Sequence, residues 1–200
     1  MSNINFFRVL QSGGDPIPQD STQIMIASLY ETTIAWSNIT TSVSTPNNAF
    51  SPCSPAVNGL LNSQNIIAQS GFTNGAAKYC LDLTTGGYSD WYLGTGSEVT
   101  YMNNGIWANS GAVRDVINDN GGDNPSNSAY YWSSNQDTIT TSKASARRLG
   151  ASTALSKVTI QRVRAQKTIK INPTTSYSVG DLAFGGVIFR IDQLTNNPPC

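Results

Sequence analysis

The side chains that could do chemistry in this 200-residue chain include a cluster of oxygen ligands after residue 114. Calcium takes about six to eight oxygen ligands from carboxylates, amides and carbonyls, so this cluster is a candidate calcium site. Its members are Asp115, Asn118, Asp119, Asn120, Asp123 and Asn124. The same composition is typical of a polar loop that its own turns hold in place. We favour the loop interpretation, and we expect no cofactor.

A second group is basic. Nine of the 12 Lys and Arg residues follow residue 140. Four of them are candidates to bind an anionic ligand such as a phosphate or a sulfated sugar: Arg147, Arg148, Arg162 and Arg164. The alternative is a solvated or salt-bridged face of a sheet, because arginines on strands pair readily with carboxylates. Basic and acidic residues number 12 each, which argues against nucleic acid or an anionic membrane as a partner.

The chain has no histidine, and so lacks the commonest general base and transition-metal ligand. We therefore expect a binding protein rather than an enzyme. Hydrophobic residues make up 38% of the chain, which is enough for a buried core. Solubility depends on Ser, Thr, Asn and Gly more than on charge, as in proteins of an extracellular or virion surface. We find no signal-peptide pattern and no apolar run of about 18 residues, so we expect no membrane insertion.

Hydrophobic periodicity and turn residues predict the elements of the chain. A hydroxyl of Thr95 or Ser97 is expected to cap a helix that begins near Glu98. A polar loop is expected from residue 40 to 55. Strands are predicted over 3–10, 24–30, 130–134, 143–149, 158–165 and 177–192, and helices over 58–68, 74–83 and 113–117.

Three segments share a recognisable pattern: GGYSDWYL at 86–93, YYWSS at 130–134 and VTIQRVR at 158–164. Together they resemble a C-type-lectin-like domain, and within that class an uncharacterised bacterial and phage family that includes the C-terminal domain of collagen-like adhesins. The resemblance implies an α+β fold with mixed small antiparallel sheets, two or three helices and long loops. Relatives usually have Pro-Ser after WYL, where this chain has Gly94 and Thr95, so the start of the following helix is open.

The order of the segments is rotated. Residues 179–192 resemble the strand that normally opens such domains, and residues 24–38 resemble the piece that follows it. The chain therefore resembles a circular permutant, with an N-terminal arm (1–20), a body (21–167) and a C-terminal arm (168–200). We expect the C-terminal strand to pair with 158–165 in cis, with pairing to a neighbouring copy as the alternative. Assembly contacts are expected from Phe6, Phe7, Val187, Phe189 and Ile191.

The resemblance also assigns roles to single residues. It implies that Trp91 and Trp132 belong to the core, and leaves Trp107 as the more exposed ring. Cys53 and Cys80 lie where relatives often carry cysteines, so they form either a disulfide or two buried thiols. Calcium-dependent sugar binding lacks its usual Glu-Pro-Asn and Trp-Asn-Asp triplets here. The candidate surface-recognition residues are Asn103, Asn104, Trp107, Asp119, Asp123 and Asn124.

These observations lead us to expect a phage virion surface protein: a tail-fibre, receptor-binding or head-decoration component. Its partners would be other virion proteins, copies of itself and a host surface glycan. The alternative is a bacterial cell-surface adhesin or glycan-binding module. A third hypothesis is a capsid decoration protein that has no receptor.

Overall fold

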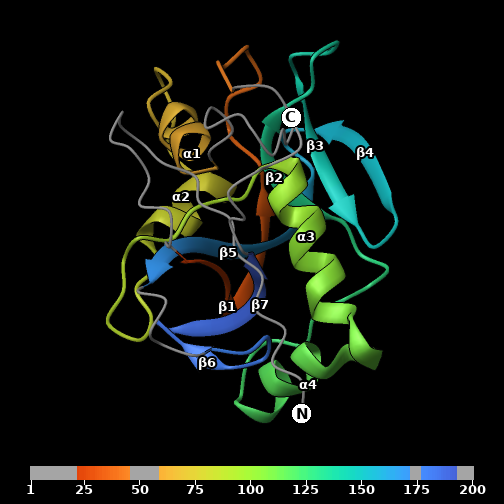
Figure 1. Ribbon diagram of the computed structural model, residues 1–200. Helices are drawn as coiled ribbons and strands as arrows, with labels where there is room; N and C mark the ends of the chain where they lie inside the picture. Colours follow the sequence, from red (N-terminus) through yellow and green to blue (C-terminus); the bar gives the residue numbers. More distant parts are fainter. Residues whose placement is uncertain (1–21, 46–58, 172–176, 193–200) are drawn as a thin grey trace, which may run out of the picture.

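The computed structural model describes residues 22–45, 59–171 and 177–192 (Figure 1). Its strands form one seven-stranded sheet in the order β4-β3-β2-β5-β1-β7-β6. Neighbouring strands are antiparallel, except that β2 and β5 meet in parallel at Tyr131 and Arg162. The strands are β1 (Thr22–Ala35), β2 (Tyr131–Gln136), β3 (Lys143–Arg148), β4 (Ala151–Ser156), β5 (Ile160–Ile171), β6 (Leu182–Ala183) and β7 (Gly186–Asp192).

The helices cover both faces of this sheet. Figure 1 shows α1 and α2 on one side of the long strands, and α3 and α4 on the other. The helices are α1 (Gly59–Ile67), α2 (Ala76–Asp82), α3 (Gly96–Trp107) and α4 (Ala112–Asp119), with a short 3-10 turn η1 (Asn109–Gly111) between the last two. The sheet is therefore the middle of three layers, and each of its faces can bury apolar side chains.

Strand β1 lies at the centre of both cores. Ile24 and Ile26 are fully buried in the core that includes residues of α1 and α2. Met25 and Ala27 are buried in the core that includes residues of α3 and α4. Because successive strand side chains point to opposite faces, a strand that is covered on both sides needs a continuous apolar run. The sequence IMIA at 24–27 is such a run.

The prediction that helices and strands are mixed in the fold is confirmed. Two details of that prediction are wrong. The described residues contain four α-helices rather than two or three, and one seven-stranded sheet rather than several small ones. The physical reason is the length of β1, whose 14 residues pair with β5 on one edge and β7 on the other, so that all the strands join one sheet.

The C-terminal strand pairs in cis, but its expected partner was wrong. Strand β7 pairs with β1, from Gln23 opposite Asp192 to Ser28 opposite Gly186. Strand β5 already pairs with β1 and β2 and has no free edge for β7. Residues 168–171 extend β5 past the expected end of the body at 167. Phe6, Phe7 and the rest of the predicted N-terminal arm lie outside the described residues.

One further difference and one agreement concern local signals. Strand β4 was missed, because its sequence ASTALS consists mostly of Ala and Ser, which are not among the residues enriched in strands. The start of α3, in contrast, follows the expected capping chemistry. The Glu98 backbone N–H donates to the Thr95 hydroxyl at 3.2 Å, and the Thr95 N–H donates to the Glu98 carboxylate at 2.7 Å. This reciprocal capping box confirms Thr95 as the cap.

Candidate binding surface

The GGYSDWYL segment binds a cation of the chain itself. Lys167, on β5, is 1% exposed, and its ammonium group donates to the Asp90 carboxylate at 2.7 Å. The same nitrogen lies 3.6 Å from the Tyr88 ring centroid and 5.1 Å from a Trp91 ring centroid. A desolvated ammonium is stabilised by a carboxylate and by aromatic faces. This segment therefore holds β5 in place, and its aromatic rings are occupied.

The tryptophans of the two motifs are core residues, as predicted. Trp91 is 0% and Trp132 1% exposed, and Trp36 is also fully buried. The Trp132 indole N–H donates to the Ile34 carbonyl at 3.0 Å, and that of Trp36 donates to the Ser133 carbonyl at 2.7 Å. The Trp91 indole nitrogen has no hydrogen-bond partner among the described residues. None of these three rings is placed to stack on a sugar.

Two of the four candidate anion-binding arginines are instead neutralised by a carboxylate of the chain itself. Arg164 is 1% exposed and donates twice to the Glu31 carboxylate, at 2.7 and 3.1 Å. It also donates to the carbonyls of Ser28 and Leu29, each at 2.7 Å. Arg162 forms a second ion pair with Glu31. The prediction that Arg162 and Arg164 receive an external anion is corrected, because the register of β1 places a carboxylate beside both of them.

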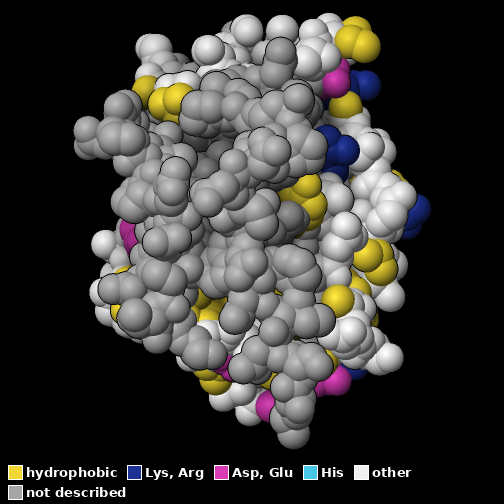
Figure 2. All heavy atoms as spheres, in the orientation of Figure 1, with side chains coloured by type: hydrophobic (Ala, Val, Ile, Leu, Met, Phe, Trp, Pro, Cys, Tyr) yellow, Lys and Arg dark blue, Asp and Glu magenta, His cyan; other side chains and the backbone are white. Residues whose placement is uncertain are grey.

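The other two arginines lie at the end of β3. Arg148 is exposed, and its guanidinium carbon lies 5.1 Å from the Tyr130 ring centroid. Arg147 is partly buried, and burial lowers the pKa of its guanidinium group. Figure 2 shows the Lys and Arg side chains spaced apart, with hydrophobic and other groups between them, on the side that carries β3 and β4. Arg148 is thus the exposed member of the four, whereas the Arg162 side chain is 33% exposed but paired with Glu31.

Glu31 is the central residue of this network, and the sequence analysis did not single it out. Its side chain is 7% exposed, and it accepts a hydrogen bond from the Tyr131 hydroxyl at 3.1 Å as well as from both arginines. Burial is the main reason why the pKa of Tyr131 is raised. One signal of this role is present in the sequence. Arg162 and Arg164 are two residues apart and therefore point to the same face of β5, and two cations that are buried together need a carboxylate partner.

The Asp- and Asn-rich loop contributes to the same network. The Asp123 carboxylate accepts from the Glu31 N–H at 2.8 Å, and the Asp123 carbonyl accepts from Arg164 at 2.6 Å. The Asn124 side-chain oxygen accepts from the Asn118 amide at 3.2 Å. Within the described ranges, no three His, Cys, Asp or Glu residues are grouped to hold a metal ion. Asp119, Asp123 and Asn124 are exposed, and the latter two fasten the loop to the sheet.

The other recognition candidates surround the turn between α3 and α4. Trp107 is partly exposed, and the Arg114 guanidinium carbon lies 5.1 Å from its ring centroid. Asn104 is exposed. Asn103 is only 2% exposed, so the prediction that it is a surface-recognition residue is wrong. It lies on the face of α3 that also carries Met102 and Ile106, both buried. We call Asn104, Trp107, Asn109, Ser110 and Arg114 the α3–α4 corner.

The backbone of this corner is unusual. Asn109 and Ser110 are exposed and have left-handed φ angles of 49° and 60°. Such conformations cost about 1–3 kcal/mol in a residue with a side chain, and they persist where the surrounding structure imposes them. Here the turn joins two helices that both pack on β7. The corner is thus a fixed surface of exposed and partly exposed groups that combines an aromatic ring, amides and a guanidinium group, which is itself paired with Asp115.

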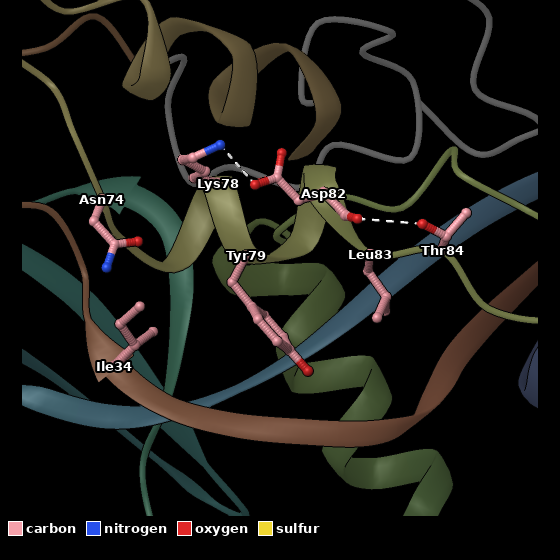
Figure 3. A pocket seen from close by; sticks show the side chains of 7 residues that line it. All are labelled: Ile34, Asn74, Lys78, Tyr79, Asp82, Leu83 and Thr84. Atoms are coloured by element: carbon pink, nitrogen blue, oxygen red, sulfur yellow. Dashed lines mark hydrogen bonds and ion pairs between the residues drawn. The ribbon is translucent and has the colours of Figure 1, made fainter.

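A pocket of about 360 Å³ opens on the opposite face of the sheet (Figure 3). It lies between α2 and the end of β1. Figure 3 shows Tyr79 on α2 and Leu83 just after its end pointing towards the strands, with the Lys78–Asp82 ion pair of 2.6 Å on the helix above them. The described residues that line it are Ile34, Asn74, Lys78, Tyr79, Asp82, Leu83 and Thr84. The sequence does not indicate this pocket, because its lining comes from two segments that lie far apart in the chain.

Cys80 is a free thiol on α2 and is fully buried. Burial raises the pKa of this thiol well above its usual range, so it stays protonated and unreactive at neutral pH. Cys53, its expected partner, lies outside the described residues, and for Cys80 the alternative of a buried thiol holds.

Comparisons with models of known protein families, with curated proteins and with solved structures find no match for this chain. Among the helices described here, none has the length and apolar character needed to cross a membrane.

Proposed function

We propose that this protein is a structural and binding component of a phage virion surface, built on a circularly permuted lectin-like module. The observation that carries the proposal is the position of β7. A permuted module needs its last strand to join the sheet of the body in cis, and β7 lies between β1 and β6 in that sheet. The two tryptophan-bearing segments also contribute to one core, since Trp91 and Trp132 belong to the same buried cluster.

The binding part of the proposal is supported by the exposed α3–α4 corner. Loops that are held by a rigid scaffold are the usual place for recognition. The internal neutralisation of Arg162, Arg164 and Lys167 leaves a surface rich in neutral polar groups, which suits hydrogen bonding to glycans and to other virion proteins. Repeated copies on a particle would raise a weak contact to a useful avidity.

The same features support the alternative of a bacterial cell-surface adhesin or glycan-binding module. Exposed Arg148 would then contact an acidic sugar. In the third hypothesis, a capsid decoration protein without a receptor, the α3–α4 corner would contact a neighbouring subunit instead.

Location is tested by quantitative mass spectrometry of phage particles purified from the strain that encodes this chain. The virion proposal expects several copies of the chain per particle, retained after a high-salt wash. Recovery in the cell envelope with none on particles would overturn it in favour of the adhesin. Glycan arrays with and without calcium then test binding, and we expect binding that is independent of calcium.

A further inference from the structure

The pocket beside Tyr79 has the chemistry of a small-molecule site. Its volume of about 360 Å³ lies at the small end of the range of roughly 300–1,000 Å³ that is typical of such sites. Ile34 and Leu83 make two apolar walls, and the half-buried Tyr79 ring lies between them. The pocket is open to solvent on one side, so a ligand that projects from a larger molecule can enter it.

Polar groups of the pocket have bonding capacity to spare. The Asn74 side-chain oxygen accepts from the Gly75 N–H at 2.9 Å, while its amide N–H groups have no partner among the described residues. The Tyr79 hydroxyl likewise has none within those ranges. At the rim, one Asp82 oxygen pairs with Lys78 and the other is free to accept. The lining thus offers an amide donor, a phenol and a carboxylate around one aromatic ring.

The charges of the lining restrict the class of ligand. Lys78 and Asp82 cancel each other at 2.6 Å, so the pocket carries no net charge. An anionic ligand would have to compete with Asp82 for Lys78, and a cationic one would have to compete with Lys78 for Asp82. A purely apolar ligand would cover polar groups without bonding them, which costs free energy. A neutral ligand that has apolar C–H groups and several hydroxyls can pack against the apolar residues of the pocket and form hydrogen bonds with its polar groups.

We infer that this pocket binds a neutral pyranose sugar. The C–H groups of the ring would pack on Tyr79, whose aromatic face is electron-rich, and the hydroxyls would bond to Asn74, Asp82 and the phenol. This inference rests on the proposed function, because it names the ligand class of a glycan-recognising module. It places the sugar on the face covered by α1 and α2, away from the α3–α4 corner.

The test uses the full chain and a panel of neutral methyl pyranosides (glucoside, galactoside, mannoside and N-acetylglucosaminide), measured by saturation-transfer difference NMR and titration. We expect at least one member to bind, Tyr79→Ala to weaken it about tenfold or more, and Tyr79→Phe to weaken it severalfold. Asp82→Asn changes only an exposed pair and leaves the fold intact, and we expect it to weaken binding severalfold.

Tyr30→Ala is the matched control, because Tyr30 is 45% exposed and outside the pocket lining. Equal binding by the wild type, Tyr79→Ala and Asp82→Asn would overturn the pocket inference and leave glycan recognition elsewhere on the molecule. No binding of any panel member by the wild type would overturn it too, while the particle assay above decides the virion role separately. Tyr79-dependent binding of an acidic sugar alone, or of an apolar dye alone, would overturn the ligand class.

Discussion

At the scale of single residues, the buried ion pairs of β5 decide how the molecule tolerates substitution. Arg164→Met would leave Glu31 nearly buried with one of its two cations. We expect the free energy of unfolding to fall by about 3 kcal/mol, because a buried charge that loses its partner is costly. Urea unfolding followed by tryptophan fluorescence measures the loss.

Arg148→Met is the matched control, since Arg148 is exposed, and we expect a change within about 0.5 kcal/mol. Adding Glu31→Gln to the Arg164→Met chain should restore part of the loss. Equal stability of the Arg164→Met and Arg148→Met proteins would show that the network contributes little.

Lys157 gives the protein a pH dependence in the alkaline range. Its side chain is buried, and its ammonium group donates to the Thr41 carbonyl at 2.7 Å and to the Gln136 side chain at 2.8 Å. Burial lowers the pKa of Lys157 from 10.5 to about 8. The folded state therefore binds the Lys157 proton more weakly than the unfolded state does. As a result, the free energy of unfolding is highest above pH 10.5, and this gain is lost as the pH falls through about 8.

We therefore expect Lys157→Met to remove a rise in stability between about pH 8 and pH 10.5. Urea unfolding of both proteins at pH 7, 8, 9 and 10 measures the difference in slope. Parallel stability profiles for the two proteins would contradict the assigned shift.

At the scale of elements, the turn of Gly86 and Gly87 before Tyr88 packs against the turn between β6 and β7, which contains Gly185. A Cβ on Gly86 would lie 2.4 Å from the Gly185 Cα, and both glycines have left-handed φ angles. Gly86→Ala is therefore expected to cost about 2–3 kcal/mol, combining a backbone penalty with an overlap of the two turns. Thermal unfolding by circular dichroism measures this loss.

Gly87→Ala is the matched control for that overlap. Gly87 also has a left-handed φ, of 81°, but a Cβ there would meet nothing within 4 Å. We expect about 1 kcal/mol from the backbone conformation alone. If both substitutions cost the same, the close approach of the two turns does not contribute to stability.

At the scale of the whole molecule, β7, which is the last described strand along the chain, is an interior strand of the sheet. A chain that ends at residue 176 lacks β6 and β7 and exposes one edge of β1, together with the cores that Val187, Ile188 and Phe189 fill. We expect this chain to lose its near-ultraviolet circular dichroism and its cooperative unfolding. A peptide of residues 177–200, added in trans, should restore both signals, and a peptide with Ile188→Asp should not. Cooperative unfolding of the truncated chain alone would contradict this role of β7.

Several features of the fold and the candidate sites follow from the sequence, because they are local. The Thr95 cap, the apolar run of β1 and the helical stripes of α1 and α2 depend on residues within a few positions of one another. The burial of Trp91 and Trp132 was also predicted, through the resemblance of their motifs. Periodicity and capping chemistry carry this information without any knowledge of tertiary contacts.

The partners across the sheet were decided by the tertiary structure alone. Three contacts join segments that lie far apart in the chain. Strand β7 lies beside β1, Glu31 neutralises Arg162 and Arg164, and Tyr79 and Ile34 share a pocket. Loop-closure entropy changes only slowly with loop length, so neither composition nor spacing selects one distant partner over another. Packing of both faces of one sheet makes that selection, because only one register buries all of these side chains together.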